Sequence, residues 1–566
     1  MQLLNPRQLK HPDFDAPTRD ILQSVVDFFE RKGKQAMKTE DHGAVWYTDF
    51  LDFIRESGFL YKFLTPSTYG QSGCRFDMAR ITAMSELLGF YSLSHWYTWQ
   101  VSILGLGPFW MSANEEMKKE VARALSDGGV FGFGLSEKEH GADLIGTDMV
   151  LETRGDGQYV ANGDKYYIGN GNCAAYVSVF AKVDGSKEFT FFAVRPDHAA
   201  YECVQNTVYS QKYVAEFELK EYPITDAEIL SRGRAAWDAS LATVAYAKFN
   251  LGLAAVGICT HSFYEAINHA GNRRLYGQYV TDFPHIQQLF GEAYARLCAM
   301  RLFSYRAKDY MRVAGPNDRR YLLFNPMVKM KVTMQGEQVI DLLWDVIAAK
   351  GFEKDQYFES ATRDIRMLPK LEGTAHVNMV LVIKFMQSFL FDTTPVSDVP
   401  SDNGPGEELF LFAQGATTKG QDKVQFGPWR KAYEPYAHLP NVSVFLQQSE
   451  QFRSFLSECG PDASQVKDLD FMLTVGEIFT LIAYGSLILE QAAFDKIDAD
   501  LIDSIFEFQV RDFSKHALNL YQKRSVNADQ QTACQKMIQR AAIDTGRANR
   551  LHTIVMQYKD MYRMND

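Results

Sequence analysis

The sequence predicts a mostly helical α+β protein with an N-terminal helical domain, a middle antiparallel β domain, a four-helix bundle and an extra C-terminal helical domain. Two observations predict this fold class. Apolar residues recur at helical spacing before residue 126 and after residue 234, whereas short β-type runs are confined to the hundred residues between them. Strands and helices are therefore segregated along the chain, which excludes the doubly wound nucleotide-binding folds, where they alternate.

The N-terminal helical domain is expected over residues 1–130. In the segment ILQSVVDFFERKGKQ the apolar residues, which include Ile21, Leu22, Val25 and Val26, recur at helical spacing. Later segments of this region repeat that pattern, so that the sequence predicts a helical unit.

The middle β domain is expected over residues 131–233. The runs YVANGDKYYIG, YVSVFAKV, EFTFFAVR and VAEFELKEYPI are of β type. Asn162-Gly163 and Asp184-Gly185 are hairpin-type turn signals between runs. These features favour a small antiparallel sandwich or barrel.

Long helical segments over residues 234–391 predict the bundle, and a polar stretch with Pro and Gly over residues 392–408 predicts a linker. Residues 409–566 form the helical extension. Their most apolar run, residues 478–489, lies between Glu477 and Glu490 and is shorter than the roughly 20 residues that cross a bilayer. We therefore expect a buried helix and no transmembrane segment.

The composition of the sequence limits the kinds of partner and the cellular compartment that we expect. The 566 residues carry 59 basic and 70 acidic side chains without a dense basic run, so we expect no nucleic-acid partner. Seven scattered cysteines without a CxxC pair are typical of free thiols in a reducing compartment. The N-terminal segment does not read as a signal or transit peptide, which favours a cytoplasmic protein. Neither GxGxxG nor GxxxxGK[ST] occurs, and no metal site is expected.

Three segments, in this order, resemble motifs of the acyl-CoA dehydrogenase family of flavoproteins. GFGLSEKEHGAD and the following YVANGDKYYIGNG are similar to the family's T-E-P-x-A-G-S-D loop and N-G-x-K-x-W-I-T-N-G strand. NRRLYGQYV is similar to R-x-x-F-G, and RDIRMLPKLEGTAH matches R-D followed eight residues after the Asp by E-G-T. The resemblance covers about residues 21–391 and implies that FAD and an acyl thioester bind where the three domains meet.

The implied reaction is the α,β-dehydrogenation of acyl-CoA to enoyl-CoA, with Glu372 as the base that takes the α-proton while a hydride passes to the flavin. Burial of a carboxylate raises its proton affinity, as this proton transfer requires. A different interpretation of Glu372 is an ordinary solvated acid or a capping residue at the start of a helix. The spacing to Asp364 favours the catalytic role.

The resemblance also implies the cofactor contacts, taken position by position. They are Phe133, Leu135, Ser136, Gly141, Tyr167, Ile168, Gly169, Thr374 and His376. Tyr167 replaces a Trp that stacks on the flavin, and Gly169 replaces a Thr or Ser. Ala142 replaces a Ser, so that one hydroxyl is missing.

Arg273 and Tyr276 match the Arg and Phe that a neighbouring subunit sends to the cofactor's diphosphate and adenine side, which implies a homodimer or homotetramer. The family's Q-x-x-G-G-x-G appears with Asp345, Ala348, Ala349 and Gly351. An acid and two alanines near a diphosphate are expected to weaken cofactor binding unless the loop has shifted.

The substrate side departs from the family pattern as well. The helix that normally reads F-D-x-x-R-P has Val244, Ala245 and Lys248 at these positions, and Lys248 and Gly373 are the expected substrate residues. Part of the usual CoA recognition is missing. The acyl group can therefore arrive on an acyl carrier protein, or the chain is a diverged CoA enzyme with other contacts.

Two further alternatives stay open at this stage: an acyl-CoA oxidase-like enzyme, and a flavin-free scaffold homologue. Within the leading interpretation, an electron-transferring flavoprotein is the implied acceptor, and fatty acid and lipid metabolism the implied setting. Residues 409–566 resemble the extension of the very-long-chain members in length and helical character. We expect them to cover apolar surface in a homodimer, with membrane-surface binding as the alternative.

Overall fold

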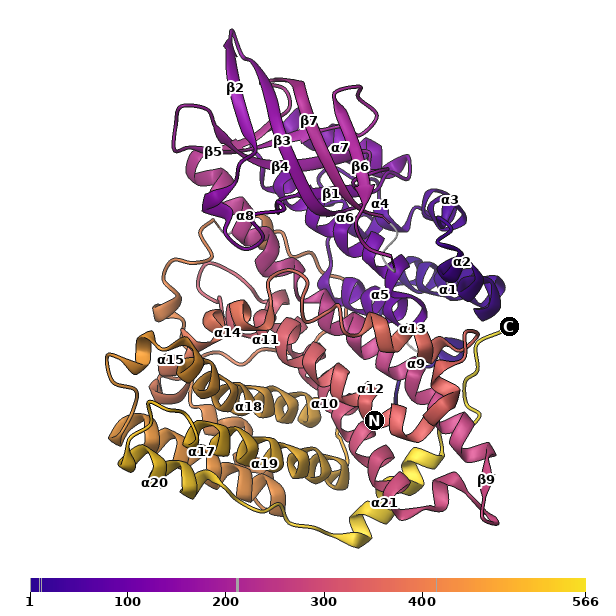
Figure 1. Cartoon of the computed structure of the whole chain (residues 1–566), viewed down its shortest axis with the longest axis vertical. Helices are drawn as coiled ribbons and strands as arrows, with labels where there is room; N and C mark the ends of the chain where they lie inside the picture. The colour runs from indigo at the N-terminus through magenta and orange to yellow at the C-terminus, as the bar shows by residue number, and fades with distance from the viewer. Residues whose placement is uncertain (1, 10, 12, 210–212, 414) are drawn as a thin grey trace.

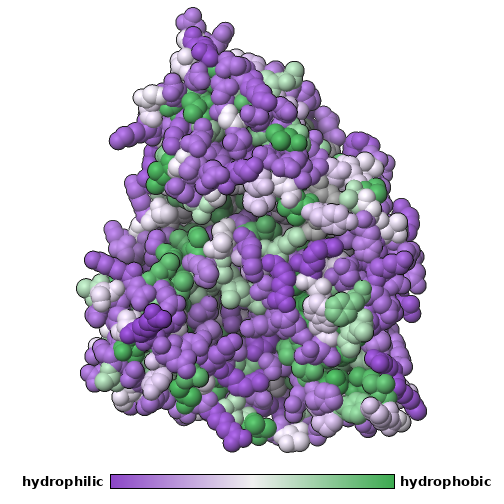
Figure 2. All heavy atoms as spheres, in the orientation of Figure 1, coloured by the Kyte–Doolittle hydropathy of each residue, from purple (hydrophilic) through white to green (hydrophobic). Residues whose placement is uncertain are grey.

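The computed structural model describes residues 2–9, 11, 13–209, 213–413 and 415–566. The β domain lies at one end of an elongated molecule, the bundle in the middle and the C-terminal extension at the other end (Figure 1). Hydrophilic residues cover most of the face drawn in Figure 2, with small scattered hydrophobic groups.

The N-terminal domain is built around two helices buried along their length. Every residue of α5 (Met78–Tyr91) is buried, and α6 (Leu93–Met111) is buried at nearly all positions. Both helices carry apolar residues on all of their faces, as expected for helices surrounded by protein. The others surround this pair: α1 (Ala16–Lys32), α2 (Lys34–Gly43), α3 (Thr48–Ser57), α4 (Phe59–Leu64) and α7 (Glu115–Ser126).

The middle domain is one eight-stranded sheet with the order β6-β7-β3-β2-β4-β5-β8, and β1 pairs with β4. Most pairs are antiparallel, as expected, but β1 and β2 each run parallel to β4. The long connection that a parallel pair requires is supplied between β1 and β4 by the β2–β3 hairpin. The strands are β1 (Phe131–Gly134), β2 (Val150–Gly155), β3 (Gln158–Gly169), β4 (Tyr176–Val183), β5 (Phe189–Val194), β6 (Tyr201–Asn206), β7 (Val214–Thr225) and β8 (Ile229–Arg232).

The bundle follows directly after the sheet, and α9, α10 and α12 pack against one another in it. An exposed hairpin of β9 (Arg274–Leu275) and β10 (Gln278–Tyr279) separates α9 from α10, and a π-helical turn at Val328–Val332 separates α11 from α12. The helices are α8 (Gly233–Ala247), α9 (Asn250–Asn272), α10 (Pro284–Arg312), α11 (Tyr321–Met327), α12 (Thr333–Ile347), α13 (Tyr357–Asp364), α14 (Ala375–Ile383) and α15 (Met386–Phe391).

Residues 392–408 contain neither helix nor strand, yet they are fixed to the bundle by hydrogen bonds. The Nη2 atom of Arg306 donates to the Val399 carbonyl at 2.7 Å, and Nη2 of Arg312 donates to the Gly404 carbonyl at 2.8 Å. The segment therefore lies along α10 as an ordered strap.

The extension packs α18 (Leu469–Phe494) against α10, α14 and α19 (Figure 1). The apolar run at residues 478–489 is buried, as the sequence predicted. By length and composition alone, α18 and the helical stretch Gly233–Asn272 could cross a membrane, but 83% of each apolar window is buried inside the protein. The remaining helices are α16 (Phe410–Ala413), α17 (Pro440–Glu458), α19 (Ala499–Tyr521), α20 (Ala528–Met537) and α21 (Thr545–Met556).

The end of the chain returns to its beginning. The Asn565 side chain donates to the Glu30 carbonyl at 2.9 Å, and the Tyr562 hydroxyl donates to the Glu30 carboxylate at 2.8 Å. Asn5 donates to the Met561 carbonyl at 3.2 Å. The C-terminus consequently lies beside α2 and α13 (Figure 1).

Candidate active site

Glu372 lies in a sharp bend between α13 and α14. Its φ is 51°, and that of Gly373 is 83°, so two consecutive residues adopt the left-handed conformation. This conformation is strained for a residue with a side chain and persists only when its surroundings impose it. The side chain that caps α14 belongs to Thr374, whose hydroxyl accepts from the Val377 amide. Glu372 is therefore not the capping residue of that helix.

The Glu372 carboxyl group faces α6. Its Oε1 atom accepts a hydrogen bond from Gln100 Nε2 at 2.7 Å. Oε2 is buried and, within the described residues, has no hydrogen-bond partner. Burial raises the pKa of this carboxyl to about 7, against the opposing effects of the Gln100 hydrogen bond and the charges of Lys248 and Lys329. The group can thus take up or release a proton near neutral pH.

Two buried lysines flank this carboxyl. Lys248, at the end of α8, is 4% exposed and donates to Asn378 Oδ1 at 3.0 Å. Lys329 is fully buried and donates to the carbonyls of Pro369, at 2.6 Å, and Gly373. Burial lowers the pKa of Lys248 to about 8 and that of Lys329 to about 7, while Glu372 acts in the opposite direction on both. Three interacting groups therefore titrate over one narrow pH range.

Tyr97 connects the Glu372 region to the end of β3. Burial, with a further contribution from Glu372, raises the pKa of its hydroxyl. A Cβ atom built on Gly169 would lie 2.7 Å from Cε1 of Tyr97 and 2.5 Å from Cγ2 of Val101. Gly169 is therefore required here by the close approach of α6, which leaves no room for a hydroxyl-bearing side chain.

The loop after β1 is held by a buried ion pair that the sequence analysis did not single out. Glu137 accepts from Lys165 Nζ at 2.7 Å, from the Asp148 amide at 2.6 Å and from the Thr147 hydroxyl. Beside it, the Ser136 hydroxyl donates to the Tyr166 carbonyl at 2.8 Å. These bonds fix the loop against β3.

The expected cofactor residues of the sheet lie on this loop and on the end of β3. Tyr167 adopts a φ of 63° and is 58% exposed, whereas Ile168 beneath it is buried. Phe133 is buried and stacks with Phe191, and Leu135 is half-buried. Gly141 is exposed, and a Cβ atom on it would meet no other atom within 4 Å.

Residues 236–387 match the family described as "Acyl-CoA dehydrogenase, C-terminal domain". A 3-(aryl)acrylate reductase from Clostridium sporogenes is 22% identical over 372 residues, which cover 64% of this chain and 96% of the relative. A crystal structure of an acyl-CoA dehydrogenase complexed with FAD, from Bacillus anthracis, superposes with a TM-score of 0.75 at 16% identity and covers 98% of this chain and 97% of that one. The chain thus resembles the acyl-CoA dehydrogenase family in sequence over residues 236–387 and has the fold of the Bacillus anthracis enzyme over nearly its whole length.

The resemblance predicted from the three motifs and the α+β, mostly helical fold class are thereby confirmed. A second similar structure is that of a prolyl acyl carrier protein oxidase, with a TM-score of 0.56 at 20% identity, covering 66% of this chain and 99% of that one. The match to the Bacillus anthracis structure also spans the C-terminal extension.

Two of the cofactor residues expected from the family motifs lie far from the other expected cofactor residues of the same chain. Arg273 precedes the β9–β10 hairpin, and Tyr276, with a φ of 51°, is 96% exposed at its tip. Figure 1 shows this hairpin at the edge of the molecule, well away from β3 and α14. One copy of the chain therefore does not bring Arg273 and Tyr276 together with Tyr167 and Thr374.

The loop in place of the family's glycine motif keeps a backbone that favours glycine. Ala348 has a φ of 55°, and both Ala348 and Ala349 are exposed. The backbone of the loop is therefore strained at Ala348. Asp345 is exposed one turn earlier on α12, and Gly351 is buried.

The remaining expected residues fall into two groups. Thr374 and His376 are exposed at the start of α14, where Val377 is 42% exposed beside them. On the substrate side, the Gly373 carbonyl accepts hydrogen bonds from Lys329 and Asn378. Lys248 is buried beside Glu372, while Val244 and Ala245 are half-buried on α8.

Sequence reasoning missed the polar residues that surround Glu372. Gln100 lies within the apolar run WYTWQVSILGLG, Lys329 within PMVKMKV and Asn378 within AHVNMVLV. All three side chains are buried. A lone polar residue in an otherwise buried helix is the signal that marks such positions, because burial requires a partner.

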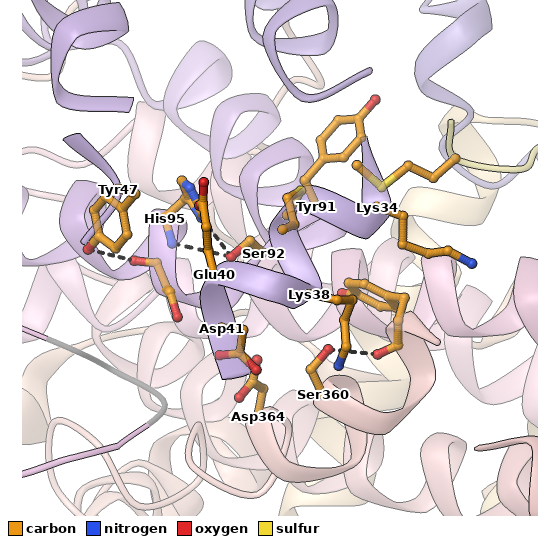
Figure 3. A pocket seen from close by; sticks show the side chains of 14 residues that line it. Lys34, Lys38, Glu40, Asp41, Tyr47, Tyr91, Ser92, His95, Ser360 and Asp364 are labelled. Atoms are coloured by element: carbon orange, nitrogen blue, oxygen red, sulfur yellow. Dashed lines mark hydrogen bonds between the residues drawn. The ribbon is translucent and has the colours of Figure 1, made fainter. Parts of the chain in front are cut away.

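A pocket apart from Glu372 lies between α2, the start of α6 and α13, lined by Lys34, Lys38, Glu40, Asp41, Tyr47, Ser92, His95, Ser360 and Asp364 among others (Figure 3). Burial raises the pKa of Asp364 to about 7, opposed by Arg363. Asp41, His42 and Glu359 are close enough to hold a cation, but Arg363 pairs with Asp41 at 2.7 Å and Lys38 pairs with Glu359. The two carboxylates of this cluster are therefore already balanced by basic side chains.

Proposed function

We propose that this protein is an FAD-dependent oxidoreductase that introduces an α,β double bond into an acyl thioester, with Glu372 as the base for the α-proton. The observation that carries the proposal is the Glu372 carboxyl itself. It is buried, its Oε2 atom has no partner within the described residues, and its pKa is raised to about 7. A general base works best when its pKa lies near the operating pH.

Several residues of this chain fit FAD. Tyr167 is 58% exposed, the Ser136 hydroxyl is bonded to the carbonyl of the preceding residue, Tyr166, and open space lies next to Gly141. Thr374 and His376 are exposed at the start of α14. Gly169 and Ala142 lack the hydroxyl groups of the family pattern, and Asp345 replaces its Gln. We therefore expect FAD to be held by aromatic and main-chain contacts more than by hydroxyl groups.

The bound flavin supplies the acceptor for the hydride that leaves the substrate's β-carbon. The chain's own task is to remove the proton from the α-carbon: that C–H bond breaks, Glu372 Oε2 receives the proton, and the electron pair forms the new C=C bond as the hydride leaves. Gln100 holds Oε1, so that Oε2 is the oxygen left for the substrate. The charges of Lys248 and Lys329 favour the carboxylate form that starts the reaction.

The cofactor site requires a second copy of the chain. Tyr276 lies on the β9–β10 hairpin and Arg273 directly before it, well away from β3 (Figure 1), so they support a homodimer or homotetramer in which each hairpin reaches the neighbour's FAD. An Arg fork suits a diphosphate. The oligomer is testable by light scattering of the purified protein.

A second candidate is dehydrogenation of acyl groups carried by an acyl carrier protein. It is favoured by Ala245 and Lys248 at the family's CoA-contacting positions, since the nucleotide half of CoA is absent from a carrier protein. The likeness to a prolyl acyl carrier protein oxidase is consistent with it. The test is to compare turnover of the same acyl chain bound to CoA and bound to an acyl carrier protein. A strong preference for CoA would exclude this candidate.

The experiment for the main proposal is optical. The purified protein is expected to be yellow and to bleach on anaerobic addition of an acyl thioester, with a series of chain lengths as the screen. A colourless protein that takes up no added FAD would overturn the proposal and leave a scaffold. Peroxide formation in air would mark an oxidase. The other implications of the resemblance, an electron-transferring flavoprotein as acceptor, fatty acid metabolism and the cytoplasm, stay predictions.

A further inference from the structure

The Glu372 bend is held from below by one side chain, that of Lys329. Lys329 Nζ donates to the carbonyl of Pro369, three residues before Glu372, at 2.6 Å, and to the carbonyl of Gly373, directly after it. The two bonds join the two ends of the loop that contains the base. Asn378 adds bonds to the Gly373 carbonyl at 3.1 Å and the Thr374 carbonyl at 3.0 Å.

Lys329 reaches the loop because of a local irregularity of its helix. Pro326 interrupts the regular hydrogen bonding, and the chain continues through the π-helical turn Val328–Val332. The Thr333 hydroxyl donates back to the Lys329 and Met330 carbonyls within this turn. Single π-turns inside helices occur frequently at functional sites.

The turn presents two lysines to different surroundings. Lys331, two residues further on, has its Nζ 5.6 Å from the centre of the Tyr484 ring and lies near Asp512 and Glu477 of the extension. Lys329 instead faces Glu372, with Lys248 and Lys370 as the other charged groups around it. Asn378, which α14 contributes, is neutral. Lys331 is thus a matched buried lysine on the same turn that does not contact the Glu372 loop.

We propose that Lys329 is a positioning residue for Glu372: by bonding both carbonyls of the loop, it maintains the left-handed bend that directs the carboxyl group toward Gln100 and the substrate. The strained backbone at Glu372 and Gly373 needs such an external restraint. The ammonium group also places a positive charge near the base. The kinetic part of this inference rests on the proposed function, whereas the restraint on the loop does not.

The test compares Lys329→Met with Lys331→Met in the full-length, flavin-loaded protein. Lys329→Met removes both hydrogen bonds and the charge, so we expect bleaching by thioester to slow roughly 10- to 100-fold. The low-pH limb of the rate should move upward by on the order of one pH unit, because a cation that favours the carboxylate is lost. Lys331→Met should leave the limb unchanged.

Hydrogen–deuterium exchange supplies the readout that is independent of activity. Peptides covering residues 366–374 should exchange faster in Lys329→Met and at the wild-type rate in Lys331→Met. Lys329→Gln, which keeps one short donor, is the second variant should Lys329→Met fail to fold. A folded Lys329 variant with wild-type exchange and a wild-type pH limb would overturn the proposal. If no thioester bleaches the wild-type protein, the proposed function fails, while the exchange comparison still decides the role of Lys329.

Discussion

The two halves of the candidate site are built in different ways. Around Glu372, Gln100, Lys329 and Asn378 are all buried, and they come from three parts of one chain. At the other half, Tyr276 is almost fully exposed and Ala348 lies on an open loop. The proton-transfer half is therefore assembled within one copy, whereas on the proposed function we expect the half that would hold the cofactor's diphosphate to need a second copy. Substitutions should separate the two accordingly.

The largest expected effect is at the base. Glu372→Gln keeps the shape of the side chain but cannot accept the proton, so bleaching by thioester should slow by about 10³-fold or more. FAD content should stay at the wild-type level, because Glu372 belongs to the half that does not hold the diphosphate. Single-turnover spectroscopy measures both quantities. Retained bleaching would remove Glu372 from the mechanism.

Next in size is the hairpin. Arg273→Ala should weaken FAD retention by on the order of tenfold or more, since a charge-assisted hydrogen bond contributes about 1.5–3 kcal/mol. The bleaching rate of the fraction that keeps FAD, and its pH dependence, should not change. Titration of the apoprotein with FAD measures the affinity, with Arg274→Ala on the same exposed hairpin as the control. Unchanged affinity would contradict the two-copy site.

A smaller effect is expected where α6 approaches β3. Gly169→Ser places a Cβ atom within 2.5 Å of Val101 and 2.7 Å of Tyr97, and overpacking of this kind costs about 1–3 kcal/mol. The thermal midpoint should fall. The double variant with Val101→Ala should regain part of the loss, and stability equal to wild type in the single variant would show that α6 can move away.

The smallest effect concerns pH in the unmodified protein. Because the pKa of Glu372 is raised to about 7 and the deprotonated form is the base, the bleaching rate should fall as pH drops through about 7. Loss of the Lys329 and Lys248 charges near pH 7 and 8 removes support for the carboxylate and should broaden this limb. Stopped-flow measurements from pH 5.5 to 9 would record it, and a limb near pH 4.5 would contradict the buried environment.

The sequence predicted the resemblance to the family and the fold class, because local periodicity and motif spacing are properties of short segments. The site residues taken from the motifs stay predictions. It could not place the partners of Glu372. Gln100 and Lys329 are 272 and 43 residues away in the chain, and only tertiary packing brings them to the same carboxyl. The parallel pairing of β1 with β4 was hidden for the same reason. Gly169 shows a further limit of prediction from sequence. The sequence indicated only that a hydroxyl group of the family pattern is missing, whereas in the structure side chains of α6 occupy the space that such a group would need.

The closure of the chain ends has a consequence for biosynthesis. Glu30 precedes its partners Tyr562 and Asn565 by 532 and 535 residues, so the ribosome adds these partners long after it. Met564, from the same tail, also lines the pocket between α2, α6 and α13. Domains form largely in the order in which they are synthesised. The face of the first helices that this segment covers therefore stays uncovered until residues 562–565 have been synthesised.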